Sequence, residues 1–98
     1  MEEIREKWMH KIRSLAPQIE KTEYEIHLND AQCKRMYAKL KMEALGEGCK
    51  TVSAQEVYAD MDDELYTQRL RLGASKGQLS ALKVELKSLE IGFEQWRT

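Results

Sequence analysis

The sequence predicts an all-α protein, an antiparallel two-helix coiled-coil hairpin that assembles into an oligomeric helical bundle. Its 98 residues include one proline and five glycines, and a chain rich in Glu, Lys, Leu and Ala with so few breakers favours helix. Apolar residues recur at alternating spacings of three and four, which is the coiled-coil pattern. A glycine-containing segment near the middle divides the chain into two arms of similar length, so we expect one hairpin domain over residues 1–98.

The first arm is expected to form a helix over about residues 3–45. Its inner seam, the side that faces the other arm, consists of Ile12, Leu15, Ile19, Thr22, Ile26, Asn29, Cys33, Met36 and Leu40. Pro17 removes one helical hydrogen bond, which costs about 3 kcal/mol in a helix interior and little in a first turn. Because Ser14 is suited to be a new N-cap, we expect either a kink near Pro17 or a short helix followed by a long one.

The turn between the arms is expected at residues 46–52. Gly46 and Gly48 are suited to the end of a helix, where a left-handed residue is common. Ser53, followed three residues later by Glu56, matches the capping box that begins many helices. These patterns predict that the second helix begins at about residue 53.

The second helix is expected to continue to about residue 97. Its inner seam consists of Met61, Leu65, Gln68, Leu72, Ser75, Leu79, Leu82, Leu86, Leu89, Phe93 and Trp96. Gly73 and Gly77 each weaken it by roughly 1 kcal/mol, so its continuity there is left open. If the chain folds back at about residue 49, the numbers of facing residues add up to about 98, and Ile26 is expected to face Leu72.

Composition and charge limit the classes of function. The net charge is -1, with 16 basic and 17 acidic residues, so the basic excess of a dedicated duplex-DNA binder is absent. No apolar run suggests a secretory signal or a membrane span. Cys33 and Cys49 are interpreted as free thiols of a cytoplasmic protein.

A second apolar pattern lies outside the inner seam. Tyr24, Ala31, Ala38 and Leu45 recur every seven residues, and so do Leu70, Gly77, Val84 and Ile91, with Ala74 and Ala81 beside them. The pattern predicts a homo-oligomer, or a groove for a partner helix, whereas scattered surface apolar residues are the ordinary alternative. The expected interface residues are Tyr24, Ala31, Ala38, Leu70, Val84, Ile91, Trp8 and Trp96. The two tryptophans fall near the open end of the hairpin, where they either seal that end or contact a partner.

Residues with catalytic chemistry are sparse. His10 and His27 have no metal-ligand spacing to other residues. Cys33 as a nucleophile would need a base and a pocket, which a slender hairpin does not offer. The acidic run from Asp60 to Glu64 is typical of a solvated helix start. We therefore expect no enzyme, no catalytic residue, no metal, no cofactor and no small-molecule substrate.

Basic residues interleaved with an aromatic are the candidate nucleic-acid site. Such a pattern is typical of single-strand binding through phosphates and stacking. The candidates are Lys34, Arg35, Tyr37, Lys39, Lys41, Arg69, Arg71 and Lys76. The alternative is that the basic residues near the turn form ion pairs with the acidic residues of 60–64. In an oligomer, weak patches would add through avidity.

Two segments carry a resemblance to a family, 34–53 with its Gly-Cys-Lys-Thr-Val-Ser turn and 86–98 with its Phe93-to-Arg97 aromatic-x-x-Trp-Arg ending. Together they resemble small bacteriophage-encoded helical hairpins, among them UvsY-like recombination mediators, over about residues 20–98. The resemblance implies a cytoplasmic accessory protein of phage DNA recombination or replication. Such a protein would act as an oligomeric mediator on single-stranded DNA, a single-strand-binding protein or a recombinase. The alternatives are an inhibitor or adaptor that docks on a host protein, or an assembly scaffold.

Overall fold

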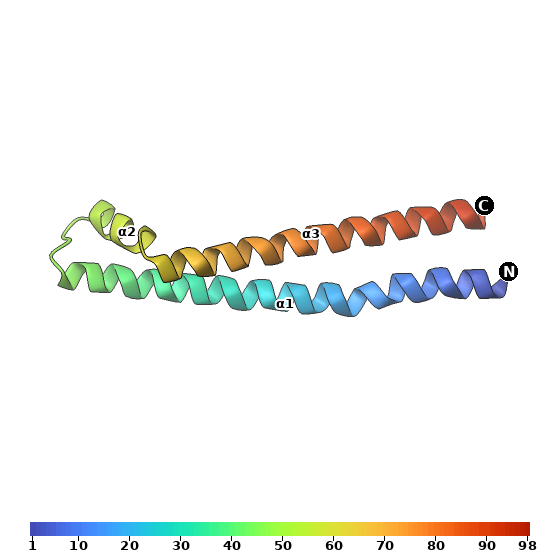
Figure 1. The fold of residues 1–98 in the computed structure, drawn as a ribbon, viewed down its shortest axis with the longest axis horizontal. Coiled ribbons are helices and arrows are strands. Elements are labelled where there is room, and N and C mark those ends of the chain that lie inside the picture. The colour runs from blue at the N-terminus through green and yellow to red at the C-terminus, as the bar shows by residue number, and fades with distance from the viewer. The chain divides into compact units, whose positions relative to one another are not determined.

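The computed structural model describes all residues 1–98 and contains three helices and no strand. Helix α1 covers Glu2–Gly46, α2 covers Val52–Asp60 and α3 covers Asp63–Arg97 (Figure 1). The expected all-helical class is confirmed, whereas assembly into a bundle stays a prediction. The chain divides into two compact units, unit 1 with Met1–Glu25 and Ser75–Thr98, and unit 2 with Ile26–Ala74.

Helix α1 continues through Pro17. The Ser14 hydroxyl donates to the carbonyl oxygen of Lys11 at 2.8 Å, and the Gln18 amide donates to that of Ser14 at 3.1 Å. Ser14 is therefore a residue within the helix and does not cap a new one. Of the two alternatives near Pro17, the short helix followed by a separate long helix is therefore wrong.

The end of α1 is a Schellman motif. Gly48 has a φ of 96°, in the left-handed region that glycine adopts without strain. The Cys49 N–H donates to the Ala44 carbonyl at 2.9 Å, and the Gly48 N–H donates to the Leu45 carbonyl at 3.2 Å. This pairing satisfies carbonyls that the helix end leaves free, so the glycine-based turn falls where it was expected.

The N-cap of α2 is Thr51, two residues before the expected Ser53. Thr51 is extended, with φ -95° and ψ 152°, and its hydroxyl accepts from the Ala54 N–H at 3.1 Å. The Gln55 side chain donates to the carbonyl of Cys49 at 3.0 Å, which fixes the start of α2 to the preceding turn. The prediction of a capping box that begins at Ser53 is therefore wrong.

The second arm is broken between Asp60 and Asp63, where one helix over residues 53–97 was expected. The Asp62 carboxylate accepts from the Leu65 N–H at 2.9 Å, so Asp62 caps a new helix. Asp favours caps over helix interiors, and Asp63 and Glu64 in the first turn complement the helix dipole. Gly73 and Gly77 do not interrupt α3.

In unit 1 the first half of α1 and the second half of α3 run antiparallel. Trp8 contacts Phe93, and Lys83 lies 3.8 Å from Glu23. The residue numbers of Trp8 and Phe93 add up to 101, close to the expected sum of about 98. Thr22, a polar residue of the inner seam, donates to the Gln18 carbonyl of its own helix at 2.8 Å.

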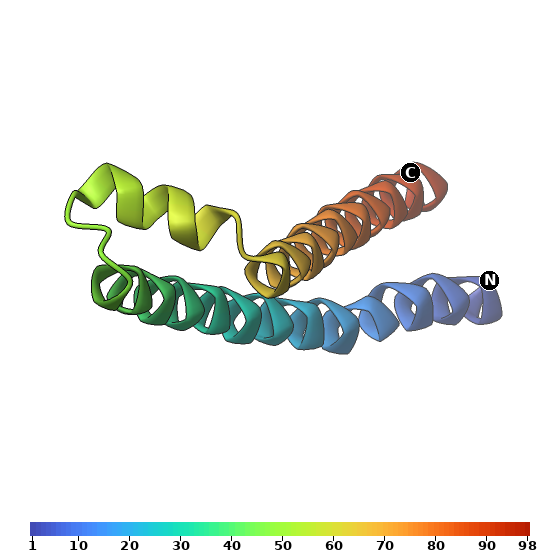
Figure 2. The ribbon, with the colours of Figure 1, turned by 60° about the vertical axis from the view of Figure 1, so that its left-hand side comes forward.

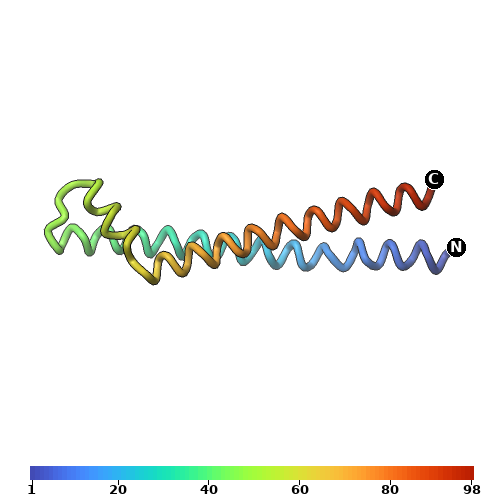
Figure 3. Tube along the Cα trace, turned by 45° about the horizontal axis from the view of Figure 1, so that its top comes forward, coloured from blue at the N-terminus to red at the C-terminus, as the bar shows by residue number.

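Unit 2 contains the best-buried cluster. Leu65 and Ala59 are fully buried and Cys33 nearly so, with Met36, Tyr37, Leu40 and Leu72 packed against them. Helix α2 lies beside the C-terminal part of α1 (Figure 2). The trace reverses after α1 and changes direction again between α2 and α3 (Figure 3). Every residue of the two predicted inner seams is buried or half-buried except Met61, which lies in the break between α2 and α3.

Candidate interaction surfaces

The outer sides of α1 and α3 carry apolar side chains that nothing in the chain covers. Tyr24 is 67% exposed, Leu70 57% and Val84 66%, so the predicted stripes lie at the surface. Two faces are defined by alternating spacings of three and four. The α1 outer face consists of Tyr24, Leu28, Ala31, Ala38, Met42 and Leu45, and the α3 outer face consists of Leu70, Ala74, Gly77, Ala81, Val84 and Ile91, all exposed.

Leu28 and Met42 were missing from the predicted stripe of α1. They lie between the sevenfold repeats, at the second position that an inner seam also uses. A search for a second seam with spacings of three and four, rather than for sevenfold repeats alone, would have found them. The position between them on this face is Arg35, the one charged residue in the series.

The two tryptophans pack within unit 1. The Trp8 ring centroid is 6.3 Å from that of Phe93 at an interplanar angle of 52°, and Trp96 stacks on Phe93 at 5.9 Å and 26°. The Arg97 guanidinium lies 5.7 Å from the Phe93 centroid. Both tryptophans are half-buried, so each stabilises unit 1 and still presents part of its ring to solvent.

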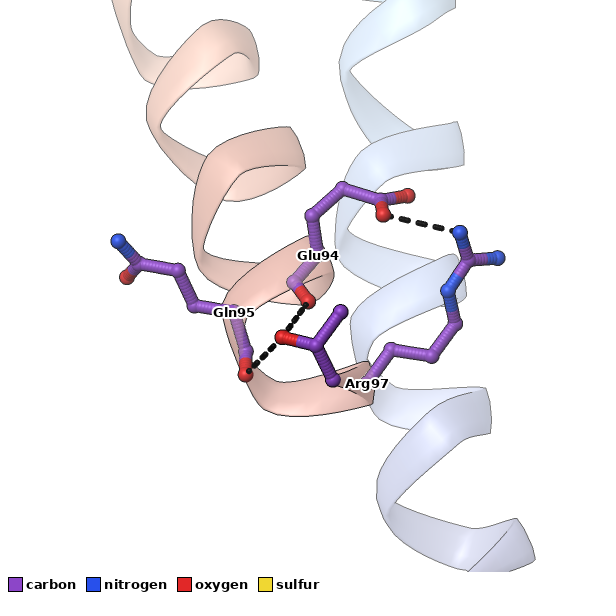
Figure 4. Close-up of polar contacts among 4 residues, drawn as sticks. Glu94, Gln95 and Arg97 are labelled. Carbon is purple, nitrogen blue, oxygen red and sulfur yellow. Dashed lines mark hydrogen bonds and ion pairs between the residues drawn. The ribbon is translucent and has the colours of Figure 1, made fainter.

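The C-terminal turn of α3 fixes this aromatic cluster. Arg97 forms an ion pair with Glu94 at 2.9 Å, and the Thr98 hydroxyl donates to the carbonyls of Glu94 and Gln95 at 3.1 and 3.3 Å (Figure 4). These bonds satisfy carbonyls that a helix end otherwise leaves to water. The guanidinium is thereby held close to the ring of Phe93.

Four of the eight nucleic-acid candidates gather on one side of unit 2. Lys41 Nζ and the Arg69 guanidinium lie 5.3 and 5.4 Å from the Tyr37 ring centroid. Arg69 is also paired with Asp60 at 2.8 Å, and Lys34 with Asp30 at 2.8 Å on its own helix. Neighbouring carboxylates therefore neutralise two of the three cations of this cluster, which we call the Tyr37 cluster.

The electrostatics of the Tyr37 cluster follow from these neighbours. Burial raises the pKa of the Tyr37 hydroxyl, and the charges of Glu56 and Asp60 raise it further against the opposing effect of Arg69. The alternative expectation was that basic residues near the turn pair with the acidic residues of 60–64 on the other arm. Lys34 instead pairs with Asp30 within α1, and Arg69, which pairs with Asp60, belongs to the same arm as Asp60.

Arg35 and Lys39 lie elsewhere in unit 2. They line an open hollow together with Gln32, Met36 and Gln68, which we call the basic hollow. Neither forms a salt bridge, and no acidic side chain lines the hollow. Arg71 is exposed and outside both groups, and Lys76 belongs to unit 1. The structure therefore divides the eight candidates instead of uniting them.

Other chemistry is limited to isolated groups. Cys33 is buried and Cys49 half-buried, and both are free thiols. Burial raises the pKa of Tyr58, with further increases from Glu43 and Glu47. No group of three or more His, Cys, Asp or Glu side chains is placed to hold a metal ion. None of the helices has the length and apolar character needed to cross a membrane.

Neither a family model, nor a curated protein, nor a solved structure matches the chain. Function is therefore inferred from the surfaces themselves.

Proposed function

We propose that the protein is a non-catalytic binding protein that self-associates through the outer faces of α1 and α3. One observation carries the proposal. The inner seam is buried or half-buried within the chain apart from Met61, whereas a second seam with the same spacing is exposed on each long helix.

The energetics favour association of such a chain. Each large apolar side chain that leaves water contributes about 1.5–3 kcal/mol when fully buried. Contiguous apolar stripes of this length exceed what most monomers expose. A seam with spacings of three and four fits another helix of the same spacing, so a second copy is a suitable occupant. Adaptor and scaffold roles would use the same surfaces.

Molecular mass in solution tests the proposal. Sedimentation over a range of concentrations should show a species larger than a monomer. Val84→Glu or Tyr24→Glu should lower the mass, because each introduces a charge into an outer face. Ser53→Glu adds the same charge on α2, outside both faces, and should leave the mass unchanged. A monomer at every concentration, with native helical content by circular dichroism, would contradict the proposal.

Binding of single-stranded nucleic acid is a second candidate function, favoured by the basic hollow. Arg35 and Lys39 present two cations without acidic neighbours beside the amides of Gln32 and Gln68, and amides and guanidinium groups are suited to phosphate and base edges. Copies of the hollow repeated in an oligomer would add through avidity. A role as a phage recombination accessory depends on this candidate and on the resemblance.

A labelled oligothymidine titrated at low salt, followed by fluorescence anisotropy, tests the second candidate. The double variant Arg35→Gln/Lys39→Gln should weaken binding and make it less salt-dependent, by a slope of about 0.7 for each phosphate that the variant no longer neutralises. Lys34→Gln is the matched control, because Lys34 is already paired with Asp30. Absence of an anisotropy change at low salt, with the oligomer intact, would exclude direct binding.

A further inference from the structure

The part of the α3 outer face from Leu70 to Val84 is nearly the same when read in either chain direction. Leu70 and Val84 lie fourteen residues apart, with the small residues Ala74, Gly77 and Ala81 between them. Because α3 is one continuous helix, these residues share one side by helical periodicity alone. The series is thus large, small, small, small, large, with its midpoint at Gly77.

The charges beside this face follow the same symmetry with opposite signs. Arg71 and Glu85 are exposed, also lie fourteen residues apart, and form no salt bridge within the chain. They border the α3 outer face on the same side, since fourteen residues are close to four helical turns. Their midpoint is Gln78, one residue from Gly77, so the centres of the charged and the apolar series differ by about 1.5 Å along the helix.

We propose that a second copy of this chain covers the α3 outer face, with the two α3 helices antiparallel about a twofold axis near Gly77. The proposal rests on the self-association proposed above and specifies its surface and symmetry. Leu70 then lies opposite Val84 of the partner copy, and Ala74 lies opposite Ala81 of the partner copy. Arg71 lies beside Glu85 of the partner copy, and the twofold axis makes this pair twice.

The small residues at the centre permit close approach of the two helices. A Cβ built on Gly77 meets nothing within 4 Å, so the chain itself does not require glycine there. Towards the ends, exposed Ile91 comes close to exposed Tyr66 of the partner copy, which extends the apolar contact. A parallel arrangement in register would instead place Arg71 and its copy at opposite borders of the interface and leave Arg71 about 21 Å from the level of Glu85, so it would not form this pair.

Charge reversal tests the antiparallel pairing. Arg71→Glu alone, or Glu85→Arg alone, places like charges together at both ends and should weaken self-association about tenfold. The double variant Arg71→Glu/Glu85→Arg restores opposite charges and should recover the wild-type dissociation constant. Each variant changes only exposed side chains, so circular dichroism should be unaltered. Unchanged single variants, or a double variant as weak as the single ones, would overturn the pairing.

Cross-linking locates the axis. In a Cys49→Ser background, Gln78→Cys should join to itself through a short bis-maleimide, because residue 78 lies near the axis. Ser88→Cys is the matched control on the same face. It lies ten residues, or about 15 Å, from the centre and therefore about 30 Å from its own copy. Self-association with linkage at residue 88 and none at 78 would overturn the twofold pairing alone, whereas a monomeric chain would overturn the proposed function as well.

Discussion

The indole of Trp8 lies against Gly92 of α3, so closely that a Cβ at residue 92 would come within 2.8 Å of the indole Cη2 and 3.1 Å of Cζ3. Glycine at this position allows the ring to reach Phe93 beside it. The aromatic cluster of unit 1 thus depends on glycine at residue 92, which has no side chain, as well as on three aromatic rings.

Gly92→Ala should therefore displace the indole of Trp8. An alanine normally stabilises a helix by up to about 1 kcal/mol over glycine, and displacement of the ring should cancel that gain. Urea unfolding and tryptophan emission measure the two effects. Gly73→Ala is the control, because its Cβ meets nothing within 4 Å, and it should show the full gain. An equal gain for both variants, with unchanged emission, would contradict the role of Gly92.

Asp62→Ala should lower the free energy of unfolding by about 1 kcal/mol, because it removes the side-chain acceptor at the start of α3. Asp63→Ala leaves this hydrogen bond in place and removes only a charge near the helix dipole, so its effect should be smaller. Chemical denaturation of both variants gives the comparison. The prediction fails if the two changes cost the same.

Pro17→Ala should raise the free energy of unfolding, by up to about 3 kcal/mol, since α1 is continuous at a residue without an N–H. Pro17→Gly restores the same N–H but adds backbone entropy to the unfolded chain, so its gain should be smaller by about 1 kcal/mol. Thermal unfolding of the two variants separates hydrogen bonding from propensity. A stability unchanged by Pro17→Ala would show that the helix end already lies at this residue.

Tyr37 and Tyr58 should ionise at higher pH than an unperturbed tyrosine of pKa 10.0, because burial and nearby carboxylates raise the pKa of both. The neutral hydroxyl is favoured by the folded state, so its contribution to stability is complete below pH 10 and is lost as the pH rises through the raised pKa. Absorbance at alkaline pH follows the titration. Tyr37→Phe and Tyr58→Phe should each remove part of the absorbance change at the high-pH end of the titration curve. A variant that removes only the low-pH part of the curve would contradict a raised pKa for that tyrosine.

The inner seam could be predicted from the sequence because burial of one helix side imposes its spacing on the residues. The approximate register followed from the position of the turn, and Cys33 and Leu65, whose numbers add up to 98, lie in one buried cluster. The break at Asp62 could not be predicted from the acidic run of residues 60–64. An aspartate that caps a helix and an aspartate on a solvated helix face give the same sequence pattern. Thr51 and Ser53 are both suited to the N-cap of α2. The hydrogen bond from the Gln55 side chain to the Cys49 carbonyl favours the cap at Thr51.

The candidate nucleic-acid residues were predicted from two segments, 34–41 and 69–76, because basic residues there are interleaved with an aromatic residue. In the structure Tyr37 and Arg69 border one side of the inner seam, whereas Lys39 borders the other. Their heptad positions contain this distinction, since residues 37 and 39 flank the seam residues on opposite sides. The pairing of Asp60 with Arg69 becomes apparent only once α2 and α3 are placed in unit 2, whereas Asp30 and Lys34 lie four residues apart on one helix.

Helix α2 has nine residues, fewer than an isolated helix needs to persist in water. It is retained by its cap, by the Gln55 bond and by burial of Ala59, which packs with Cys33. Local opening of α2 would uncover the Cys33 thiol without melting α1 or α3. The rate at which a thiol reagent modifies Cys33 then measures the rate of that opening. Amide hydrogen exchange in α2 should proceed at the same rate.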